Sequence, residues 1–378
     1  MKLDKPVFWL ALITLLIGAY GMLTRVFVGR SEVNYGSYIP WGLEVAGYTF
    51  LSGISAGAFL MAALAYVFDI KRLEKLRLIG IIAALSTSIA ALIIIISDLG
   101  HPLRALTSLV NINLSSAMAW TFIIFPLYML VIIAMSWMIP KGDGRKVKAL
   151  AAIGILLALV LEFADGAIYS VVGAKPYWNA GILTIMFLTS SLLTGIAFVA
   201  FIAYVLYSDS EEHMENMRNL RLPLLYLVLF YALLEFSDIV SLYYAKIPSD
   251  IASINLVLFG PYGWVFWTFF VFGSVLIPAV LLAFDGKKSL PLALASFFLL
   301  ISFPSTKMNI LLPGLAVPEL KGLETAFVHE RLMFSYFPST MEWLIFLFCF
   351  SLSVVLVIAG TRRIVDKKPV MSLIKEVA

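Results

Sequence analysis

The sequence predicts an all-helical membrane protein that crosses the bilayer ten times. Hydrophobic residues make up 62% of the 378 residues and charged residues only 13%, whereas soluble domains carry roughly 25% charged residues. Apolar runs of about 20 residues recur along the chain, and this is the length that a helix needs to cross a bilayer. The runs lack the alternation of β-strands, and only helices or closed barrels satisfy their backbone groups in lipid. These observations therefore favour a bundle of transmembrane helices.

Ten candidate spans are bounded by charged residues, proline or glycine, and they cover residues 8–28, 43–68, 76–97, 115–139, 147–172, 182–207, 222–245, 263–284, 290–311 and 341–361. The first follows a basic flank without a small-residue cleavage site, so we interpret it as a membrane helix and not as a signal peptide. The even number permits two four-helix bundles, helices 2–5 and 6–9, with helices 1 and 10 beside them. The predicted regions are 1–42 (first helix and outer loop), 43–180 (first bundle), 181–311 (second bundle) and 312–378 (outer loop, tenth helix and tail).

Basic residues predict the orientation of these helices. Of the 27 Lys and Arg residues, 19 lie at the termini and in the loops after helices 2, 4, 6 and 8. The opposite side holds the other eight, which are Arg25, Arg30, Arg104, Lys175, Lys246, Lys307, Lys321 and Arg331. Because cytoplasmic loops carry an excess of Lys and Arg, both termini are predicted to be cytoplasmic in a multi-pass protein of the cell membrane. The loop 98–114 is then outside.

Several kinds of cofactor and partner are not expected. The only cysteine, Cys349, lies in an apolar run, so this chain ligates no iron–sulfur cluster and has no cysteine-based metal site. His101, His213 and His329 lie outside the predicted spans, so no intramembrane haem is expected. Phosphate-binding and dinucleotide fingerprints are absent from the sequence. The net charge of +4 is explained by orientation in the lipid membrane, and no nucleic-acid partner is expected.

The polar loop between helices 3 and 4 is a candidate site. Asp98, His101 and Arg104 lie within seven residues, and Asn113 follows in the same loop. Arginine keeps a neighbouring carboxylate ionised, and histidine can pass a proton near neutral pH. A polar cluster at the outer mouth of helices 3 and 4 is one interpretation. The alternative is a helix-end cap with a surface ion pair of small energy.

Two predicted spans carry paired carboxyl groups. Glu162 and Asp165 in helix 5, and Glu235 and Asp238 in helix 7, are each three residues apart and therefore share a helix face. Charged groups near the bilayer centre cost roughly 2.5–3.5 kcal/mol on insertion scales, so these four should not face lipid. The pairs are candidates for proton transfer, and Tyr169 extends the face in helix 5. Alternatively, each carboxyl only bonds a neighbouring helix.

Other segments add weaker indications. Helices 2 and 6 share a pattern at a constant offset, in which Gly57 matches Gly195, and this indicates a possible internal repeat. Gly53 and Gly57 make helix 2 thin on one face, as close helix packing or a planar ligand requires. Aromatic residues between helices 5 and 6 are expected from the interfacial belt alone. Residues 319–337 could form an amphipathic helix on the outer surface, as a docking face or as an ordinary interfacial helix.

Four stretches resemble the NrfD-like family, the membrane subunits of polysulfide reductase type. They are DLGHPLR after helix 3, the following NINLSSAMAW, WGLEVAGYTFLSGISAGAF in helix 2 and KPYWNAG before helix 6. The resemblance covers helices 2 to 9 and is more specific in the first bundle. Ten spans instead of eight are similar to the larger members, which include the membrane subunit of a sulfur-respiration complex.

The resemblance implies a subunit of a quinone-dependent oxidoreductase that is not catalytic alone. Menaquinone or another quinone would bind in the first bundle near the outer face, at Asp98, His101 and Arg104, with Glu44 from helix 2. Asn113 and Tyr169 complete the predicted quinone-binding residues. Electrons would pass to or from a ferredoxin-like iron–sulfur subunit docked outside. Further membrane, cytochrome or cytoplasmic catalytic subunits would complete a respiratory complex, with sulfite or another sulfur compound as the suspected substrate. Proton translocation is possible in such a complex.

Two other functions remain open from the sequence. A secondary transporter would also use intramembrane carboxyls, and it would have helices broken at matching positions; Pro126 in helix 4 and Pro278 in helix 8 are such a pair. An anchor that holds electron-transfer partners without binding quinone is the other alternative.

Overall fold

The computed structural model describes residues 4–29, 32–142, 144–175, 177–283, 287–329 and 331–364. In these residues, ten helices are long and apolar enough to cross a membrane. The chain is therefore a multi-pass membrane protein. Five basic residues of the predicted orientation count lie outside the described residues: Lys2, Arg30, Lys367, Lys368 and Lys375.

Nine of the spans are single long helices: α1 (Asp4–Phe27), α2 (Leu43–Val67), α3 (Glu74–Asp98), α4 (Ala117–Met138), α5 (Gly144–Ser170), α6 (Ile182–Tyr207), α8 (Arg221–Ala245), α12 (Ser289–Ala316) and α14 (Thr340–Ile364). The remaining span joins α10 (Gly263–Val265), the π-helical segment η4 (Phe266–Leu276) and α11 (Ile277–Ala283). Shorter elements connect them: η1 (Lys71–Leu73), η2 (Pro102–Leu109), η3 (Ile139–Lys141), α7 (Glu211–Arg218), α9 (Pro248–Leu258) and α13 (Leu323–Ala326).

The predicted all-helical class and its ten spans are confirmed. Most boundaries agree within a few residues, because hydrophobic length and flanking charge determine where a membrane helix ends. The largest extension is at α12, which was predicted to end at residue 311 and continues through Pro313 to Ala316. The helix α4 also continues through Pro126.

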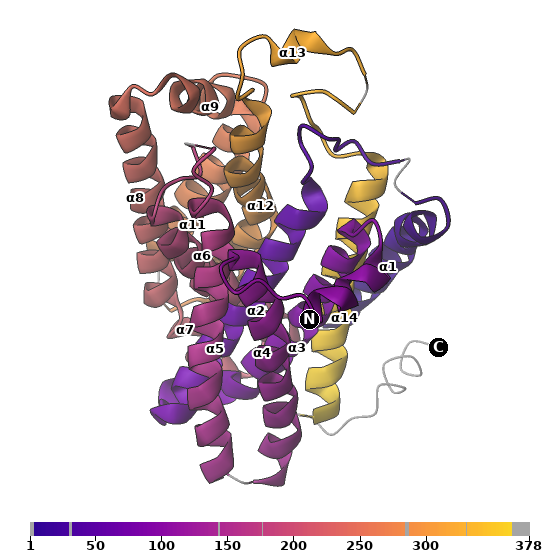
Figure 1. Cartoon of the computed structure of the whole chain (residues 1–378). Helices are drawn as coiled ribbons and strands as arrows, with labels where there is room; N and C mark the ends of the chain where they lie inside the picture. The colour runs from indigo at the N-terminus through magenta and orange to yellow at the C-terminus, as the bar shows by residue number, and fades with distance from the viewer. Residues whose placement is uncertain are drawn as a thin grey trace.

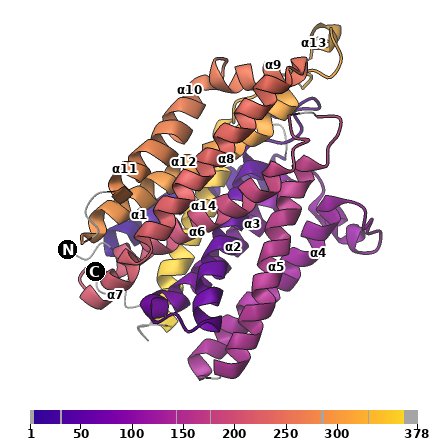
Figure 2. The same cartoon turned by 90° about the vertical axis from the view of Figure 1, so that its left-hand side faces the viewer.

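The helices form two packed groups with a third pair beside them. In the first group α2 packs on α3 and α5, and α4 packs on α5. In the second group α8 and α12 each pack on both α6 and α11. Figure 1 shows α8, α11 and α12 on one side of the molecule and α1 with α14 on the other, and α2 lies between them. The view turned by 90° shows α4 and α5 together at one edge (Figure 2).

The two groups meet where α2 crosses α6. A Cβ added at Gly57 would overlap the backbone of Ser191, and one added at Gly195 would overlap the backbone of Gly57 and Ala58. The two glycines of the suspected repeat therefore face each other and let the helix backbones touch. Gly53 also lies against Ser191. Of the two interpretations of the thin face of α2, the structure supports close helix packing.

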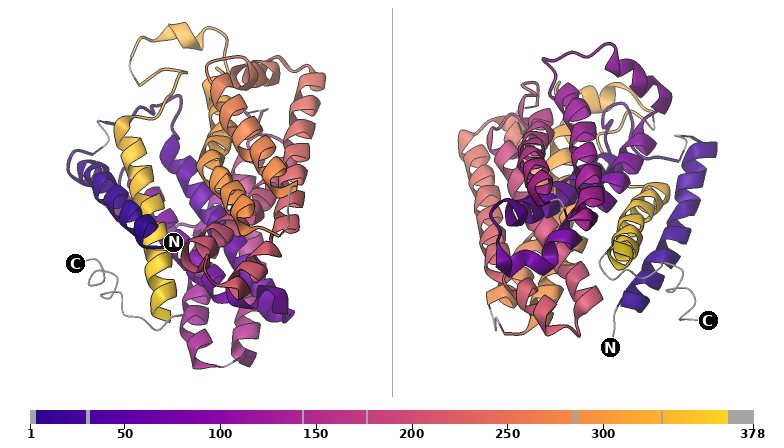
Figure 3. Two further views of the ribbon diagram at one scale, coloured as in Figure 1. Left: turned by 180° about the vertical axis from the view of Figure 1, so that it is seen from behind. Right: turned by 90° about the horizontal axis from the view of Figure 1, so that it is seen from below.

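The helices α1 and α14 pack along each other, and α14 also packs on α3. The view from below shows this pair together beside the bundles (Figure 3). Near one end, Arg362 forms an ion pair with the buried Asp4. Near the other end, the buried Arg25 Nε donates to Ser97 O at 2.6 Å and its Nη2 donates to Leu99 O at 3.3 Å. A guanidinium thus satisfies carbonyl groups at the end of α3, where a positive charge is favoured.

Alternation of the spans places five connections on one face, which we call the loop-rich face: residues 28–42, 99–116, 171–181, 246–262 and 317–339. The prediction of a longer amphipathic helix over 319–337 is wrong, because among the described residues of this segment only Leu323–Ala326 is helical. Gly322 adopts a left-handed conformation with φ of +91° just before it. After it, Arg331 O accepts a hydrogen bond from Ser37 N at 2.8 Å. This bond joins the segment to the loop before α2. The segment therefore lies extended along that loop and does not continue as a helix.

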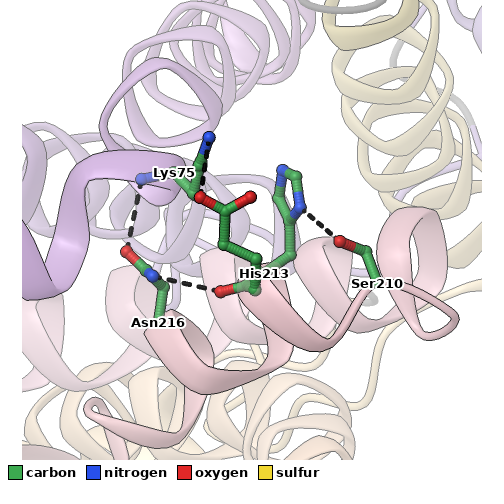
Figure 4. Close-up of polar contacts among 5 residues, drawn as sticks. Lys75, Ser210, His213 and Asn216 are labelled. Carbon is green, nitrogen blue, oxygen red and sulfur yellow. Dashed lines mark hydrogen bonds and ion pairs between the residues drawn. The ribbon is translucent and has the colours of Figure 1, made fainter.

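On the opposite face, α7 ties the two groups together (Figure 4). The Lys75 ammonium lies 3.0 Å from Glu212, and Lys75 N donates to Asn216 Oδ1 at 3.3 Å. His213 bonds Ser210 Oγ through Nδ1 at 2.9 Å and stacks on Tyr207. These contacts fix the short helix against the start of α3.

Candidate functional site

Two adjacent serines in α6 form the centre of a buried polar network. Ser191 Oγ donates to the Glu162 carboxyl of α5. Ser190 Oγ accepts a hydrogen bond of 2.8 Å from the Lys307 ammonium of α12. All four side chains are buried. They meet because the close crossing of α2 and α6 brings α6 deep between the two helix groups.

Asp165 lies one helical turn from Glu162 and is held by three donors. Ser52 Oγ donates to Oδ2 at 3.0 Å, while Thr121 Oγ1 and Tyr48 Oη donate to Oδ1 at 3.2 and 3.4 Å. These donors come from α2 and α4. The sequence therefore correctly places both carboxyls on an inward face of α5, and the structure supplies their partners.

Lys307 is a functional candidate that the sequence interpretation missed, because it was only counted among the basic residues of the outer side. Its side chain is buried in α12, and its Nζ lies 3.8 Å from the centroid of the Phe187 ring. It interacts electrostatically with Glu162, Asp165 and Glu235. Position 307 already falls within the predicted span 290–311, so a basic residue inside an apolar run was the signal that could have identified it.

The second carboxyl pair lies in α8, and its Glu235 also interacts electrostatically with Lys307. Glu235 of α8 is buried, and Asp238 is half-buried one turn nearer the loop-rich face. Asp238 in turn interacts with Asp250 of α9. Burial and the carboxyls of Glu235 and Asp238 hold the pKa of Tyr177 well above its ordinary value. The Tyr177 hydroxyl therefore stays protonated, and it donates to Asn309 O at 3.2 Å.

A small pocket opens beside this second pair. It has a volume of about 160 Å³ and is lined by Ala174, Lys175, Tyr177, Ser249, Ser253, Gly314, Val317, Pro318 and Glu319. An ion pair of 3.0 Å between Lys175 and Glu319 lies at its rim. Tyr177 belongs both to the lining and to the electrostatic surroundings of Glu235.

A separate group of carboxyls lies where α2 and α14 begin and α3 ends. Glu44, Glu342 and Asp98 are all buried, and Glu44 is close enough to the other two for electrostatic interaction. Glu342 accepts hydrogen bonds from Tyr336 Oη, from Ser339 N at 2.8 Å and from Asn34 N at 3.1 Å. Within the described residues, neither carboxyl oxygen of Glu44 has a hydrogen-bond partner.

The other predicted loop residues lie at the surface. His101, Arg104 and Asn113 are exposed. Arg104 N donates to His101 O at 2.9 Å, and Asn113 Oδ1 accepts from Ser115 Oγ at 2.7 Å, so both contacts are local turns. Asp98 alone of this group is buried beside Glu44.

Tyr169 belongs to a cluster of aromatic rings at the end of α5. Tyr169 is buried, and its ring packs on Trp178 and Trp41 at centroid distances of 5.3 and 6.1 Å. Trp178 is 2% exposed and donates to Ile310 O at 2.8 Å. This tryptophan therefore belongs to the core and not to the interfacial belt that the sequence indicated.

The family of this chain follows from its sequence over most of its length. Residues 32–319 match the family model described as "Polysulphide reductase, NrfD". The chain belongs to the NrfD family. The match runs from the loop before α2 to the residue before Leu320, so α1 and α14 lie outside it.

Curated relatives of the NrfD-family chain come from several organisms. A selenate reductase subunit of Mesobacillus selenatarsenatis is 25% identical over 367 residues, which cover 87% of this chain and 86% of the relative. The Hdr-like menaquinol oxidoreductase integral membrane subunit of Archaeoglobus fulgidus is 25% identical over 349 residues, covering 89% and 88%. Protein NrfD of Escherichia coli is 26% identical over 188 residues, covering 42% and 58%.

Proposed function

We propose that the chain is the quinone-interacting membrane subunit of a respiratory oxidoreductase complex. In this proposal it exchanges electrons between menaquinol and an iron–sulfur partner and is not catalytic alone. Family membership supports a role in an oxidoreductase complex, and one relative is named a menaquinol oxidoreductase subunit. The structural observation that carries the proposal is the buried Glu44 carboxyl, which lacks a hydrogen-bond partner in the described residues and lies beside Asp98.

These residues fit a quinol chemically. A buried carboxyl oxygen without a partner is costly, so an arriving hydroxyl donor would be stabilised there. Oxidation of a quinol supplies two electrons and two protons. Glu44 and Asp98 would accept a hydrogen bond and then a proton, while His101 would pass protons toward solvent from its exposed position. Arg104 and Asn113 would contact the quinone headgroup. The Tyr169 ring would line the quinone-binding site.

The electron partner would dock on the loop-rich face. Exposed apolar side chains lie there on two connections, with Leu103 and Val110 in or beside η2 and Leu320, Phe327 and Val328 around α13. A binding patch of this composition suits a protein partner, because apolar surface gains free energy when covered. The predicted orientation puts this face outside the cell membrane, so the iron–sulfur subunit would be extracytoplasmic.

Finer features of the function are also proposals. Glu162, Asp165, Glu235 and Asp238 would transfer protons, and this leaves open a net translocation across the membrane. The second substrate of the complex would be a sulfur compound, and the partner subunits would bind it.

Secondary transport is the alternative function. It would favour helices broken at matching positions, but α4 continues through Pro126. Near Pro278 the backbone changes from π-helix to α-helix without a break in the span. The redox function is therefore the one that the geometry supports better.

The proposal is tested in the complex purified with its native partners. We expect quinone to be extractable from the complex and a menaquinol analogue to reduce the iron–sulfur centres. Asp98→Asn and His101→Ala should each abolish quinol oxidation, because each removes a proton acceptor from the predicted site. The measurement is the rate of centre reduction by stopped-flow absorbance.

The matched control is Glu215→Gln, which removes an exposed carboxyl from α7 on the opposite face. It should leave the rate unchanged. Unaltered turnover of the Asp98 and His101 variants would remove these residues from the site. A purified complex that contains no extractable quinone and does not oxidise the quinol analogue would contradict the proposed function.

A further inference from the structure

We propose that Lys307 couples the two carboxyl pairs, so that the protonation of Glu162 and Asp165 in one bundle responds to that of Glu235 in the other. This inference deepens the proposed function and rests on it for the source of the protons. It makes the four carboxyls one unit with a cation at its centre, instead of two independent sites.

The position of Lys307 between the helix groups is the first argument. It lies in α12, bonds Ser190 of α6 at 2.8 Å, and interacts with carboxyls of both α5 and α8. Its side chain is 4% exposed, so water screens these interactions little. A change of charge at either carboxyl pair therefore changes the electrostatic energy of the lysine ammonium. Through the ammonium it also changes the proton affinity of the other pair.

Charge balance is the second argument. Glu162, Asp165 and Glu235 are buried and share one buried ammonium. A buried charge without a partner is strongly destabilising, and one ammonium balances one carboxylate. The remaining carboxyls are therefore balanced by protons. When a proton leaves one carboxyl, the ammonium is drawn to it and a carboxyl of the other pair becomes the favoured place for a proton.

The hydrogen-bond pattern around the lysine is the third argument. The ammonium has three N–H donors; one bonds Ser190, and the group also lies over the Phe187 ring. Ser191, the next residue, donates to Glu162. The serine pair thus holds the lysine and a carboxyl of the first bundle in a fixed relation, while leaving donors of the ammonium available to the second bundle.

The transfer balances without another reactant. The Lys307 ammonium gives a proton to the Glu235 carboxylate and becomes the neutral amine. Glu162 then gives its proton to this amine, so the transfer leaves a Glu162 carboxylate beside the ammonium and a protonated Glu235. Glu235 passes the proton by way of Asp238 toward the pocket of about 160 Å³ that Tyr177 lines. No electrons move in these steps.

The experiment measures the coupling directly in the intact complex. Infrared difference spectra between two pH values report the C=O stretch of protonated carboxyls and need no quinol. Glu162→Gln and Glu235→Gln identify the two bands. In the otherwise native complex, Glu235→Gln should shift the titration of the Glu162 band; in a Lys307→Met background this shift should be lost. A double-mutant comparison of this kind isolates the interaction from the individual effects.

Lys175→Met is the matched control, because it removes an ammonium that pairs with Glu319 at the pocket rim. It should leave the coupling intact. Lys307→Arg should retain it, since a buried cation remains. If Lys307→Met does not assemble, Ser190→Ala replaces it and should weaken the coupling by displacing the ammonium.

An equal shift of the Glu162 band with and without Lys307 would overturn the inference. So would an absent shift in the native background. Quinol oxidation is recorded on the same samples. A complex that shows the coupling but does not oxidise quinol contradicts the proposed function alone, whereas one that oxidises quinol without coupling contradicts only this inference.

Discussion

At the scale of single residues, Tyr336 joins the loop-rich segment to the candidate quinone site. Its hydroxyl donates to Glu342 and accepts a hydrogen bond of 2.8 Å from Leu43 N at the start of α2. Burial and the carboxyls of Glu342 and Glu44 hold its pKa well above the ordinary value, so the hydroxyl stays protonated. The hydroxyl thus fixes the first turn of α2, which carries Glu44.

Tyr336→Phe removes this hydroxyl with little change of shape. Two buried partners lose a hydrogen bond, and each such loss costs about 1–3 kcal/mol. We expect a lower thermal unfolding midpoint in detergent. The control is Tyr20→Phe on α1, where the side chain is 70% exposed. Equal midpoints for the two variants would show that the Tyr336 contacts contribute nothing to stability.

At the scale of elements, the crossing of α2 and α6 determines where the polar network lies. Gly57 and Gly195 allow backbone contact there, and Ser190 and Ser191 lie about one turn before Gly195 in α6. The same turn meets α5 through Glu162 and α12 through Lys307. A wider crossing would move the serines away from both partners.

Gly57→Ala and Gly195→Ala should therefore weaken the crossing. In each variant the new methyl group meets helix backbone, which cannot rotate away, and overpacking costs about 1–3 kcal/mol or more. The expected result is a lower unfolding midpoint and a smaller yield of assembled complex. Gly144→Ala is the control, because an added Cβ there meets nothing within 4 Å. A midpoint as high as that of the control would contradict close packing at the crossing.

At the scale of the whole molecule, the loop-rich face collects the candidate quinone site, the pocket beside Tyr177 and the exposed apolar connections. The orientation of this face in the membrane is predicted from the unequal distribution of basic residues. The helix contacts in the structure do not bear on it. The orientation decides on which side of the membrane the iron–sulfur partner would bind. The orientation is therefore the property of the whole molecule that most needs a measurement.

Single cysteines report the orientation directly. The native Cys349 is buried, so it should not react. In intact cells, Ser115→Cys on the exposed loop after η2 should be labelled by an impermeant maleimide. Lys141→Cys at the other face should be labelled only after the cells are opened. The reverse pattern would place the loop-rich face in the cytoplasm and the partner with it.

The sequence was sufficient to predict the ten membrane spans. It was also sufficient to predict that the two carboxyls of α5, and likewise those of α8, share a helix face. Both properties are local: hydrophobic length sets a membrane helix, and a separation of three residues puts Glu162 and Asp165 on one face. The sequence could not tell that His101 and Arg104 would be exposed while Asp98 is buried, because burial depends on which helices pack there. The short extent of α13 has the same cause, since contacts with distant loops compete with helix formation.

What the sequence alone determined is the ten membrane spans, the family resemblance and the kinds of group that could carry protons. Only the tertiary structure decided their partners. Lys307 bonds Ser190 across 117 residues of sequence, and Tyr336 and Glu342 reach α2 from beyond the part of the chain that matches the family. Such pairings depend on how helices cross, and small residues such as Gly57 set that distance through packing, which no local pattern specifies.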